Sequence, residues 1–177
     1  MKIEKVGVIG AGQMGSGIAH VCAVAGFGVM LNDLSPDRIK SALATINGNM
    51  ARQVSKKLIG EDERKSALGR IQPAETLDAL SDCDLVIETA TEKEDVKRKI
   101  FAGLCVALKP EAIIGTNTSS ISITRLASST DRPERFIAAS TSRCVITPRT
   151  AWRWRLRSIM PRALPSVSAL MSSMTTS

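Results

Sequence analysis

A glycine-rich motif near the N-terminus constrains the fold of this chain more than any other feature. Gly10, Gly12 and Gly15 form the pattern G-x-G-x-x-G. The β-branched residues within 6–9 precede it and predict a buried strand, and apolar residues at helical spacing follow from Met14. In such a strand–turn–helix the first glycine makes the tight turn, the second admits a pyrophosphate and the third lets the helix pack on the strand. The helix N-terminus then faces the phosphates.

An acidic residue after the next expected strand supports this interpretation. Residues 28–32 are predicted to form that strand, and Asp33 follows them. A carboxylate about 20 residues past the glycines stands where it can accept a hydrogen bond from a ribose 2′-hydroxyl. The alternative is a glycine-rich turn and an aspartate that only caps the next helix. Because strand, glycines, helix and acid stand in register, the sequence favours a dinucleotide site.

The positive charge is concentrated at one end of the chain. The sequence of 177 residues, long enough for one domain with an appendage, has a net charge of +7. Residues 1–137 hold 18 Lys and Arg against 17 Asp and Glu, whereas residues 138–177 hold six Arg and no acid. The globular part is therefore nearly neutral, and we expect no nucleic-acid partner. The weakest alternative is nucleic-acid binding through the arginines with Trp152 and Trp154.

The sequence carries no sign of a membrane, secretory or metal-binding protein. No apolar run is long enough to span a bilayer, and the N-terminus lacks a signal-peptide pattern. The four cysteines form no C-x-x-C pair; these cysteines are Cys22, Cys83, Cys105 and Cys144. We therefore expect reduced, mostly buried thiols, no bound metal and a cytoplasmic location. His20, the only histidine, lies on the helix committed to phosphate, so we expect a structural role for it.

Two consecutive helices are predicted between the second and third strands. Apolar residues at three- and four-residue steps predict a long helix from Pro36 to about Lys57, and Gly60 ends it. Residues 61–68 predict a second, shorter helix. The pair is longer than a crossover between strands needs, so we expect it to project from the sheet. Lys56 and Lys57 indicate either a site for an anionic substrate handle or a solvated helix end.

Polar residues follow a later strand at the edge where ligands bind. Strands are predicted at 70–74, 84–88, 112–116 and 135–138. A helix is predicted before Pro110, and its apolar face consists of Val96, Ile100, Leu104 and Leu108. Residues 117–120 (Asn-Thr-Ser-Ser) come at the carboxyl end of the strand 112–116, where open α/β sheets bind ligands. They are suited to bond a cofactor and a hydroxyl substrate, or to cap the helix that begins near Ser122.

These stretches together resemble the NAD-dependent 3-hydroxyacyl-CoA dehydrogenases, which include bacterial 3-hydroxybutyryl-CoA dehydrogenases. The resemblance covers residues 1 to about 137, and the matching segments are 8–19, Asp33, 84–88 with Glu92 and Lys97, 116–121 and 135–137. It implies an α/β, Rossmann-type doubly wound, mostly parallel sheet with an inserted helical pair at about 36–69. It also implies NAD as the cofactor.

The resemblance implies roles for individual residues in cofactor binding. Asp33 would hold the adenosine ribose. Glu92 and Lys97 match positions that contact the nicotinamide half of NAD, and Asn117 would also contact the cofactor. The pyrophosphate would lie against the glycine motif, that is Gly10, Ala11, Gly12, Gln13, Met14 and Gly15.

The resemblance also implies an acyl-CoA substrate. Ser119 matches the serine that hydrogen-bonds the substrate 3-oxygen, and Asn117 lies beside it, so these two are the candidate catalytic residues. Lys56 matches a lysine that contacts coenzyme A, and Asn49 stands where some members have a CoA-contacting serine.

The family reaction is the reversible oxidation of (S)-3-hydroxyacyl-CoA to 3-ketoacyl-CoA, in fatty-acid or short-chain acyl-CoA metabolism. A histidine removes the hydroxyl proton, and a glutamate orients it. In the family, Phe-Ile is followed by Gly-x-His-Phe-x-Asn-Pro, whereas here Phe136 and Ile137 lead into Ala-Ala-Ser-Thr-Ser-Arg-Cys. The histidine, the glutamate and the helical domain through which members dimerise are absent from the sequence. We therefore expect NAD binding with impaired catalysis. The alternative is a non-catalytic NAD- or acyl-CoA-binding protein.

Residues 138–177 differ from the rest in composition. They lack Lys and acids, show no sustained period and are rich in Arg, Ser, Thr and Pro, so we expect an irregular, disordered tail. We interpret the tail as the out-of-frame product of a shifted gene. Residues 139–142 (Ala-Ser-Thr-Ser) can be encoded as GCA-TCC-ACT-TCA, which read two bases later gives Ile-His-Phe.

Overall fold

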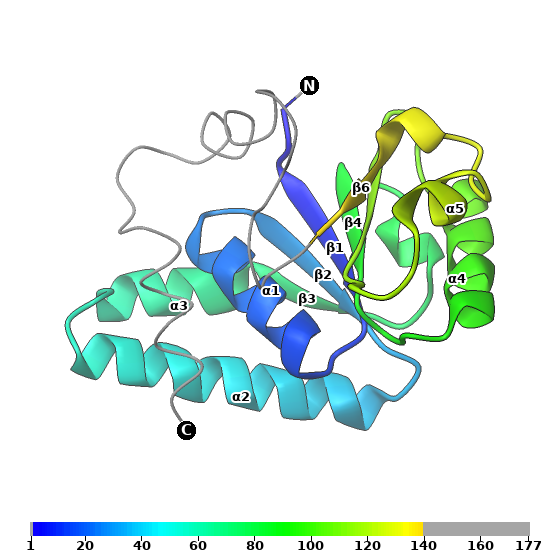
Figure 1. Cartoon of the computed structure of the whole chain (residues 1–177). Coiled ribbons are helices and arrows are strands. Elements are labelled where there is room, and N and C mark those ends of the chain that lie inside the picture. The colour runs from blue at the N-terminus through cyan, green and yellow to red at the C-terminus, as the bar shows by residue number, and fades with distance from the viewer. Residues whose placement is uncertain (1, 140–177) are drawn as a thin grey trace, which may run out of the picture.

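The computed structural model describes residues 2–139, which form a six-stranded parallel sheet with helices on both faces (Figure 1). The strand order is β3-β2-β1-β4-β5-β6, and every neighbouring pair is parallel. The strands are β1 (Lys5–Ile9), β2 (Gly28–Asn32), β3 (Ile71–Ala74), β4 (Leu85–Glu88), β5 (Ile113–Thr116) and β6 (Phe136–Ala138). The chain order reverses between β1 and β4, which is the switch point of a doubly wound sheet. The predicted Rossmann-type fold is confirmed.

The helices fall into two groups (Figure 1). α1, α2 and α3 follow β1 and β2, and α4 and α5 follow β4 and β5. Their bounds are α1 (Gln13–Val24), α2 (Pro36–Ser55), α3 (Glu61–Gly69), α4 (Glu94–Ala107) and α5 (Ile123–Ala127), with short 3-10 turns at Asp78–Leu80 and Pro133–Arg135. No helix within residues 2–139 is both long and apolar enough to cross a membrane.

Each face of the sheet has its own hydrophobic core. Along β4, Leu85 and Ile87 join the core formed with α1 and α2, whereas Val86 joins Phe101 and Leu104 of α4. This alternation follows from the period of two in a strand, and it explains why β4 is apolar on both faces.

The buried face of α4 differs from the predicted one. Val96, expected in the apolar row, is 40% exposed, whereas Lys97 is fully buried. The buried row is Lys97, Phe101, Leu104 and Leu108. The prediction was wrong at its first position because a buried charge cannot be recognised by hydrophobic periodicity. The partner of Lys97 lies on another element.

The helical pair packs on α1. Ile39, Ala42, Ile46 and Met50 are buried on one face of α2, within the same core as the residues of α1 and β1. Ala67 of α3 belongs to this core as well. The apolar face of α2 therefore packs against α1, which lies beside it in Figure 1.

The domain continues past the predicted boundary at residue 137. β6 ends at Ala138, and the amide of Ala139 donates to the carbonyl of Thr116 at 2.9 Å. Ala138 and Ala139 therefore continue the pairing with β5 past residue 137. The predictions for the tail from residue 140 onward, for Cys144 and for the two tryptophans concern residues 140–177, which lie outside the described residues.

His20 is buried in the interface between α1 and α2. Its exposed fraction is 0%, and Nε2 lies 3.1 Å from Oε1 of the buried Gln53. Nδ1 is also buried and has no hydrogen-bond partner among the described residues. Burial lowers the pKa of His20, because the charged ring cannot be solvated there; the bond with Gln53 opposes this only in part. The placement agrees with a structural role.

The buried histidine predicts a loss of stability in mild acid. Because the pKa is lower in the folded state, the unfolded chain binds the proton first, and stability falls as pH drops below about 6.5. By about pH 5.5 this group should cost up to about 1.4 kcal/mol. Thermal or urea unfolding of the wild type and of His20→Asn at both pH values measures the difference. His20 is the only histidine, so an equal loss in His20→Asn would contradict this account.

Candidate functional site

The glycine motif packs α1 tightly against the end of β1. A Cβ added at Gly15 would lie 1.7 Å from the carbonyl oxygen of Gly10, so only glycine permits this approach. Gly10 has a φ of +98°, and a Cβ there would lie 2.7 Å from the Cα of Ala90. Two of the three glycines are therefore required by the fold itself.

The third glycine of the motif is not required by any contact within the described chain. Gly12 is the N-cap of α1, and a Cβ built there would meet no atom within 4 Å. The first turn of α1 carries no acidic residue, and the N-cap makes no side-chain hydrogen bond. Free backbone amides and the positive end of the helix dipole thus face open space, which fits a pyrophosphate.

Asp33 joins the glycine loop to the end of β2. Its Oδ2 accepts from the amide of Ala11 at 2.8 Å, and its Oδ1 accepts from the amide of Ser35 at 3.0 Å. Each carboxylate oxygen can accept a second hydrogen bond, so the side chain is fixed in orientation and keeps capacity for a ligand hydroxyl. The placement beside α1 fits the predicted ribose contact.

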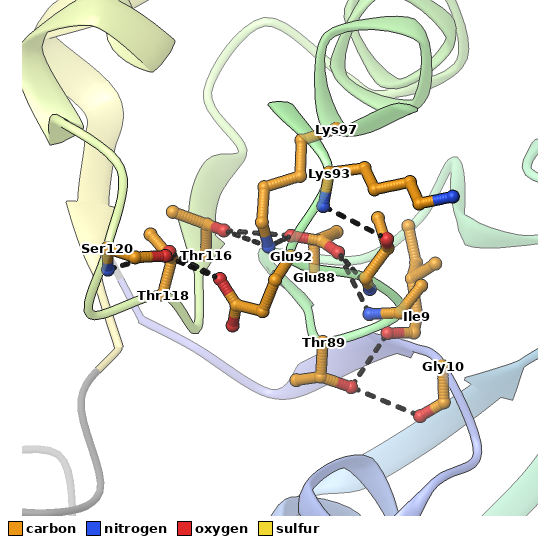
Figure 2. A network of polar contacts seen from close by, with 12 residues as sticks. Ile9, Gly10, Glu88, Thr89, Glu92, Lys93, Lys97, Thr116, Thr118 and Ser120 are labelled. Carbon is orange, nitrogen blue, oxygen red and sulfur yellow. Dashed lines mark hydrogen bonds and ion pairs between the residues drawn. The ribbon is translucent and has the colours of Figure 1, made fainter. Parts of the chain in front are cut away.

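A buried ion pair lies under the carboxyl ends of β4 and β5 (Figure 2). Nζ of Lys97 lies 2.5 Å from Oε2 of Glu88, and both side chains are 0% exposed. The hydroxyl of Thr116 donates to the same Oε2 at 2.8 Å and lies 3.1 Å from Nζ. The ammonium of Lys97, predicted to face the nicotinamide, therefore lies inside the protein in this structure. Removing one partner of such a pair typically costs about 3–5 kcal/mol.

The loops above this pair are joined by Glu92 (Figure 2). Its Oε2 accepts from the hydroxyls of Thr118 at 2.7 Å and Ser120 at 3.3 Å. Ser119 lies between these two residues and is exposed, and the amide of Asn117 donates to the carbonyl of Glu88 at 2.8 Å. The structure thus brings Glu92, Asn117 and Ser119 to one edge of the sheet, at the carboxyl ends of β4 and β5.

A surface cluster holds the helix that follows these loops. Ser122, the N-cap of α5, accepts from the amide of Arg125, which confirms the predicted helix start. Glu94 of α4 accepts hydrogen bonds from Arg125 and Arg98, and these bonds lower the pKa of Glu94. The loop from residue 117 to 122 is therefore held at both ends.

The two predicted coenzyme A residues lie elsewhere. Lys56 caps the C-terminal end of α2, and Asn49 lies two turns earlier, where its side-chain oxygen accepts from Arg52. Figure 1 places that end of α2 beside α3, apart from the loops after β4 and β5. These residues and the nicotinamide loops therefore form two separate groups.

Three polar residues of the site were not singled out from the sequence. Glu88 ends an apolar strand, Thr116 ends another, and the hydroxyl of Thr89 donates to the carbonyl of Ile9 at 2.9 Å. An acid or hydroxyl at the last position of an otherwise apolar strand is a signal in the sequence. Lys97 fits no apolar face, and its partner became evident only from the arrangement of β4 and α4.

Comparison with known proteins gives a consistent result. The family model described as "3-hydroxyacyl-CoA dehydrogenase, NAD binding domain" matches residues 5–140. A 3-hydroxybutyryl-CoA dehydrogenase of Bradyrhizobium diazoefficiens is 72% identical over 135 residues, which are 76% of this chain and 46% of that protein. A 3-hydroxybutyryl-CoA dehydrogenase of Mycobacterium tuberculosis is 43% identical over 136 residues, which cover 76% of this chain and 48% of the relative.

Solved structures agree with these relatives. The (S)-3-hydroxybutyryl-CoA dehydrogenase PaaH1 of Ralstonia eutropha superposes with a TM-score of 0.75 at 42% identity, over 77% of this chain and 48% of that chain. A 3-hydroxybutyryl-CoA dehydrogenase of Escherichia coli gives 0.76 at 37% identity, over 78% and 29%. The chain spans about half the length, or less, of the curated relatives that it matches.

The glycines predict a separation of binding from stability. Gly12→Ala should change the free energy of unfolding by less than about 1 kcal/mol, because no atom is close, yet weaken NADH binding at least about tenfold by filling the pyrophosphate's approach. Gly15→Ala should lower stability by about 2–3 kcal/mol or more through overpacking. Urea unfolding and NADH fluorescence titration measure the two quantities.

A matched control is available in α2. A Cβ at Gly48 also meets nothing within 4 Å, so Gly48→Ala should leave NADH affinity unchanged. Full NADH affinity in Gly12→Ala would contradict a pyrophosphate at this helix end.

Proposed function

Because the chain belongs to the 3-hydroxyacyl-CoA dehydrogenase family, we propose that residues 2–139 are the NAD-binding half of an enzyme that oxidises (S)-3-hydroxyacyl-CoA to 3-ketoacyl-CoA. The observation that carries this proposal is the open N-terminus of α1 at the switch point between β1 and β4, with Asp33 beside it. Ligands of doubly wound sheets bind at this point.

In this proposal the cofactor extends along the carboxyl edge of the sheet. Asp33 accepts the adenosine ribose hydroxyls, and the open backbone amides that follow Ala11, at the N-terminus of α1, hold the pyrophosphate. Glu92 and Asn117 contact the nicotinamide half. Bound NAD supplies the hydride acceptor, and these residues hold it at a fixed distance from the substrate.

The substrate in this proposal is an acyl-CoA. Ser119, exposed above β5, donates a hydrogen bond to the 3-oxygen. Lys56 caps the end of α2 and Asn49 lies two turns earlier, where a cation and an amide suit the phosphates of a coenzyme A handle. The same proposal includes dimerisation through the helical domain of the complete relatives. It also includes a cytoplasmic location, where thiols such as the free Cys83 stay reduced.

We further propose that this chain is catalytically impaired. Its only histidine, His20, is buried between α1 and α2 and cannot reach a hydroxyl substrate above β5. A positioned general base typically contributes about 10²–10⁴-fold. The second candidate, a non-catalytic NAD- or acyl-CoA-binding protein, is favoured by the same observation.

The charge of Asp33 predicts a preference for NADH over NADPH. A carboxylate accepts the ribose 2′-hydroxyl and repels a 2′-phosphate. Asp33→Asn removes the charge but keeps an acceptor for the Ala11 amide, so the ratio of NADPH to NADH affinity should rise about 10- to 100-fold. Asp33→Ala should weaken NADH more than NADPH. Fluorescence titrations with both cofactors measure the ratio.

Asp37, exposed in the first turn of α2, provides the control. Asp37→Asn removes a nearby charge and should leave the ratio unchanged. Wild-type protein that binds NADPH as tightly as NADH would refute the role of Asp33.

The missing base predicts slow turnover. Reduction of acetoacetyl-CoA by NADH, followed at saturating cofactor, should be at least about 100-fold slower than for a full-length relative. The NADH titration of the same sample serves as the control for a folded site. Turnover equal to that of the relative would contradict impairment and would point to another base. NADH binding without turnover would support both an impaired enzyme and a non-catalytic NAD- or acyl-CoA-binding protein.

A further inference from the structure

A single buried carboxylate joins three elements beneath the proposed nicotinamide site. Glu88 ends β4, Thr116 ends β5, and Lys97 lies in the first turns of α4. All three side chains are 0% exposed. Oε2 of Glu88 receives the ammonium of Lys97 and the hydroxyl of Thr116, and both bonds appear in Figure 2.

The other oxygen of the same carboxylate holds the loop after β4. Oε1 accepts from the amide of Ala90 at 2.8 Å and from the amide of Thr91 at 3.3 Å. The backbone carbonyl of Glu88 accepts from the amide of Asn117 at 2.8 Å. Glu88 therefore bonds directly to both loops that carry the proposed nicotinamide contacts. Four donors occupy its carboxylate, so neither oxygen is free to turn toward a ligand.

A second set of hydrogen bonds, made by exposed side chains, connects the same loops above the buried carboxylate of Glu88. Glu92 stands one residue after Thr91 and accepts from Thr118 and Ser120 in the opposite loop. The buried layer and the exposed layer thus connect the same two loops (Figure 2). Since the exposed layer consists of surface hydroxyls and a surface carboxylate, the buried layer sets the geometry.

We propose that Glu88, with Lys97 and Thr116, is a positioning group that fixes the spacing of the loops 89–93 and 117–120 for the nicotinamide half of the cofactor. Lys97 holds Glu88 and Thr116 in place through its ammonium. This inference rests on the proposed function, because it requires the nicotinamide to lie over these loops.

The chemistry of the group favours positioning over simple packing. Apolar side chains of similar volume would also hold α4 against β4 and β5, commonly without loss of stability. They could not bind the amides of Ala90 and Thr91 or the hydroxyl of Thr116. Directional bonds from a saturated carboxylate fix orientation as well as contact, which is what a preorganised site needs.

The proposal is tested by comparing two ligands that differ in the nicotinamide. NADH occupies the whole site, whereas ADP-ribose lacks the nicotinamide ring. Glu88→Gln and Thr116→Val should weaken NADH about tenfold more than ADP-ribose, a ratio typical of one lost charge-assisted hydrogen bond. They should also reduce the emission shift of bound NADH, which reports the surroundings of the ring. Thr116→Ser, which keeps the hydroxyl, should restore both.

Asp84 is the matched control at the opposite end of β4. Its carboxylate pairs with Lys109 at 2.6 Å and accepts from the amides of Glu4 and Lys5, so it has the same chemistry away from the site. Asp84→Asn should lower the melting temperature and change both affinities equally or not at all. Should Glu88→Gln fail to fold because Lys97 is left unpaired, Thr116→Val, which keeps the ion pair, decides the question.

Two results would overturn the inference while leaving the proposed function intact. One is an equal loss of NADH and ADP-ribose affinity in Glu88→Gln and Thr116→Val, as a purely structural role predicts. The other is the same ligand selectivity in Asp84→Asn. Wild-type protein that binds neither ligand would instead overturn the proposed function and this inference with it.

Discussion

The close approach of α1 to the end of β1 is the constraint on which the rest of the site depends. The contact between Gly15 and the carbonyl of Gly10 leaves no room for a side chain. It places the N-terminus of α1 at the carboxyl edge of the sheet, where Asp33 binds the amide of Ala11 and Thr89 binds the carbonyl of Ile9. The three ends of β1, β2 and β4 are thereby joined around one helix terminus. That terminus, open at Gly12, is the proposed anion site.

The two halves of the proposed site are built differently. On the side of β1 and β2, backbone amides and a partly buried Asp33 face outward, and a ligand completes their hydrogen bonds. On the side of β4 and β5, the strongest polar groups bond to one another inside the protein, and Glu92 and the loop from Asn117 onward face outward. The first half therefore binds by charge and open donors, whereas the second half binds by fixed shape. This division fits a cofactor with an anionic pyrophosphate centre and a flat ring with a carboxamide at its end.

Local patterns in the sequence predicted most of the fold. The glycine motif, the period of the strands and the polar residues after β5 each depend on neighbouring residues, so they could be recognised without the structure. The buried face of α4 could not, because Lys97 is buried by Glu88 from another strand. The packing of α2 on α1 was missed for the same reason, since an apolar face does not reveal what covers it. Glu88 and Thr116 were overlooked because a polar strand end is equally compatible with a solvated edge.

A crystal structure of the protein with NADH tests the central claim most directly. The account predicts the pyrophosphate within hydrogen-bond distance of the amides that follow Gly12, and a ribose hydroxyl on Asp33. It also predicts the nicotinamide over the loops after β4 and β5, with Lys97 still bound to Glu88 beneath it. A pyrophosphate bound away from the N-terminus of α1, or a nicotinamide bound away from the loops after β4 and β5, would contradict it.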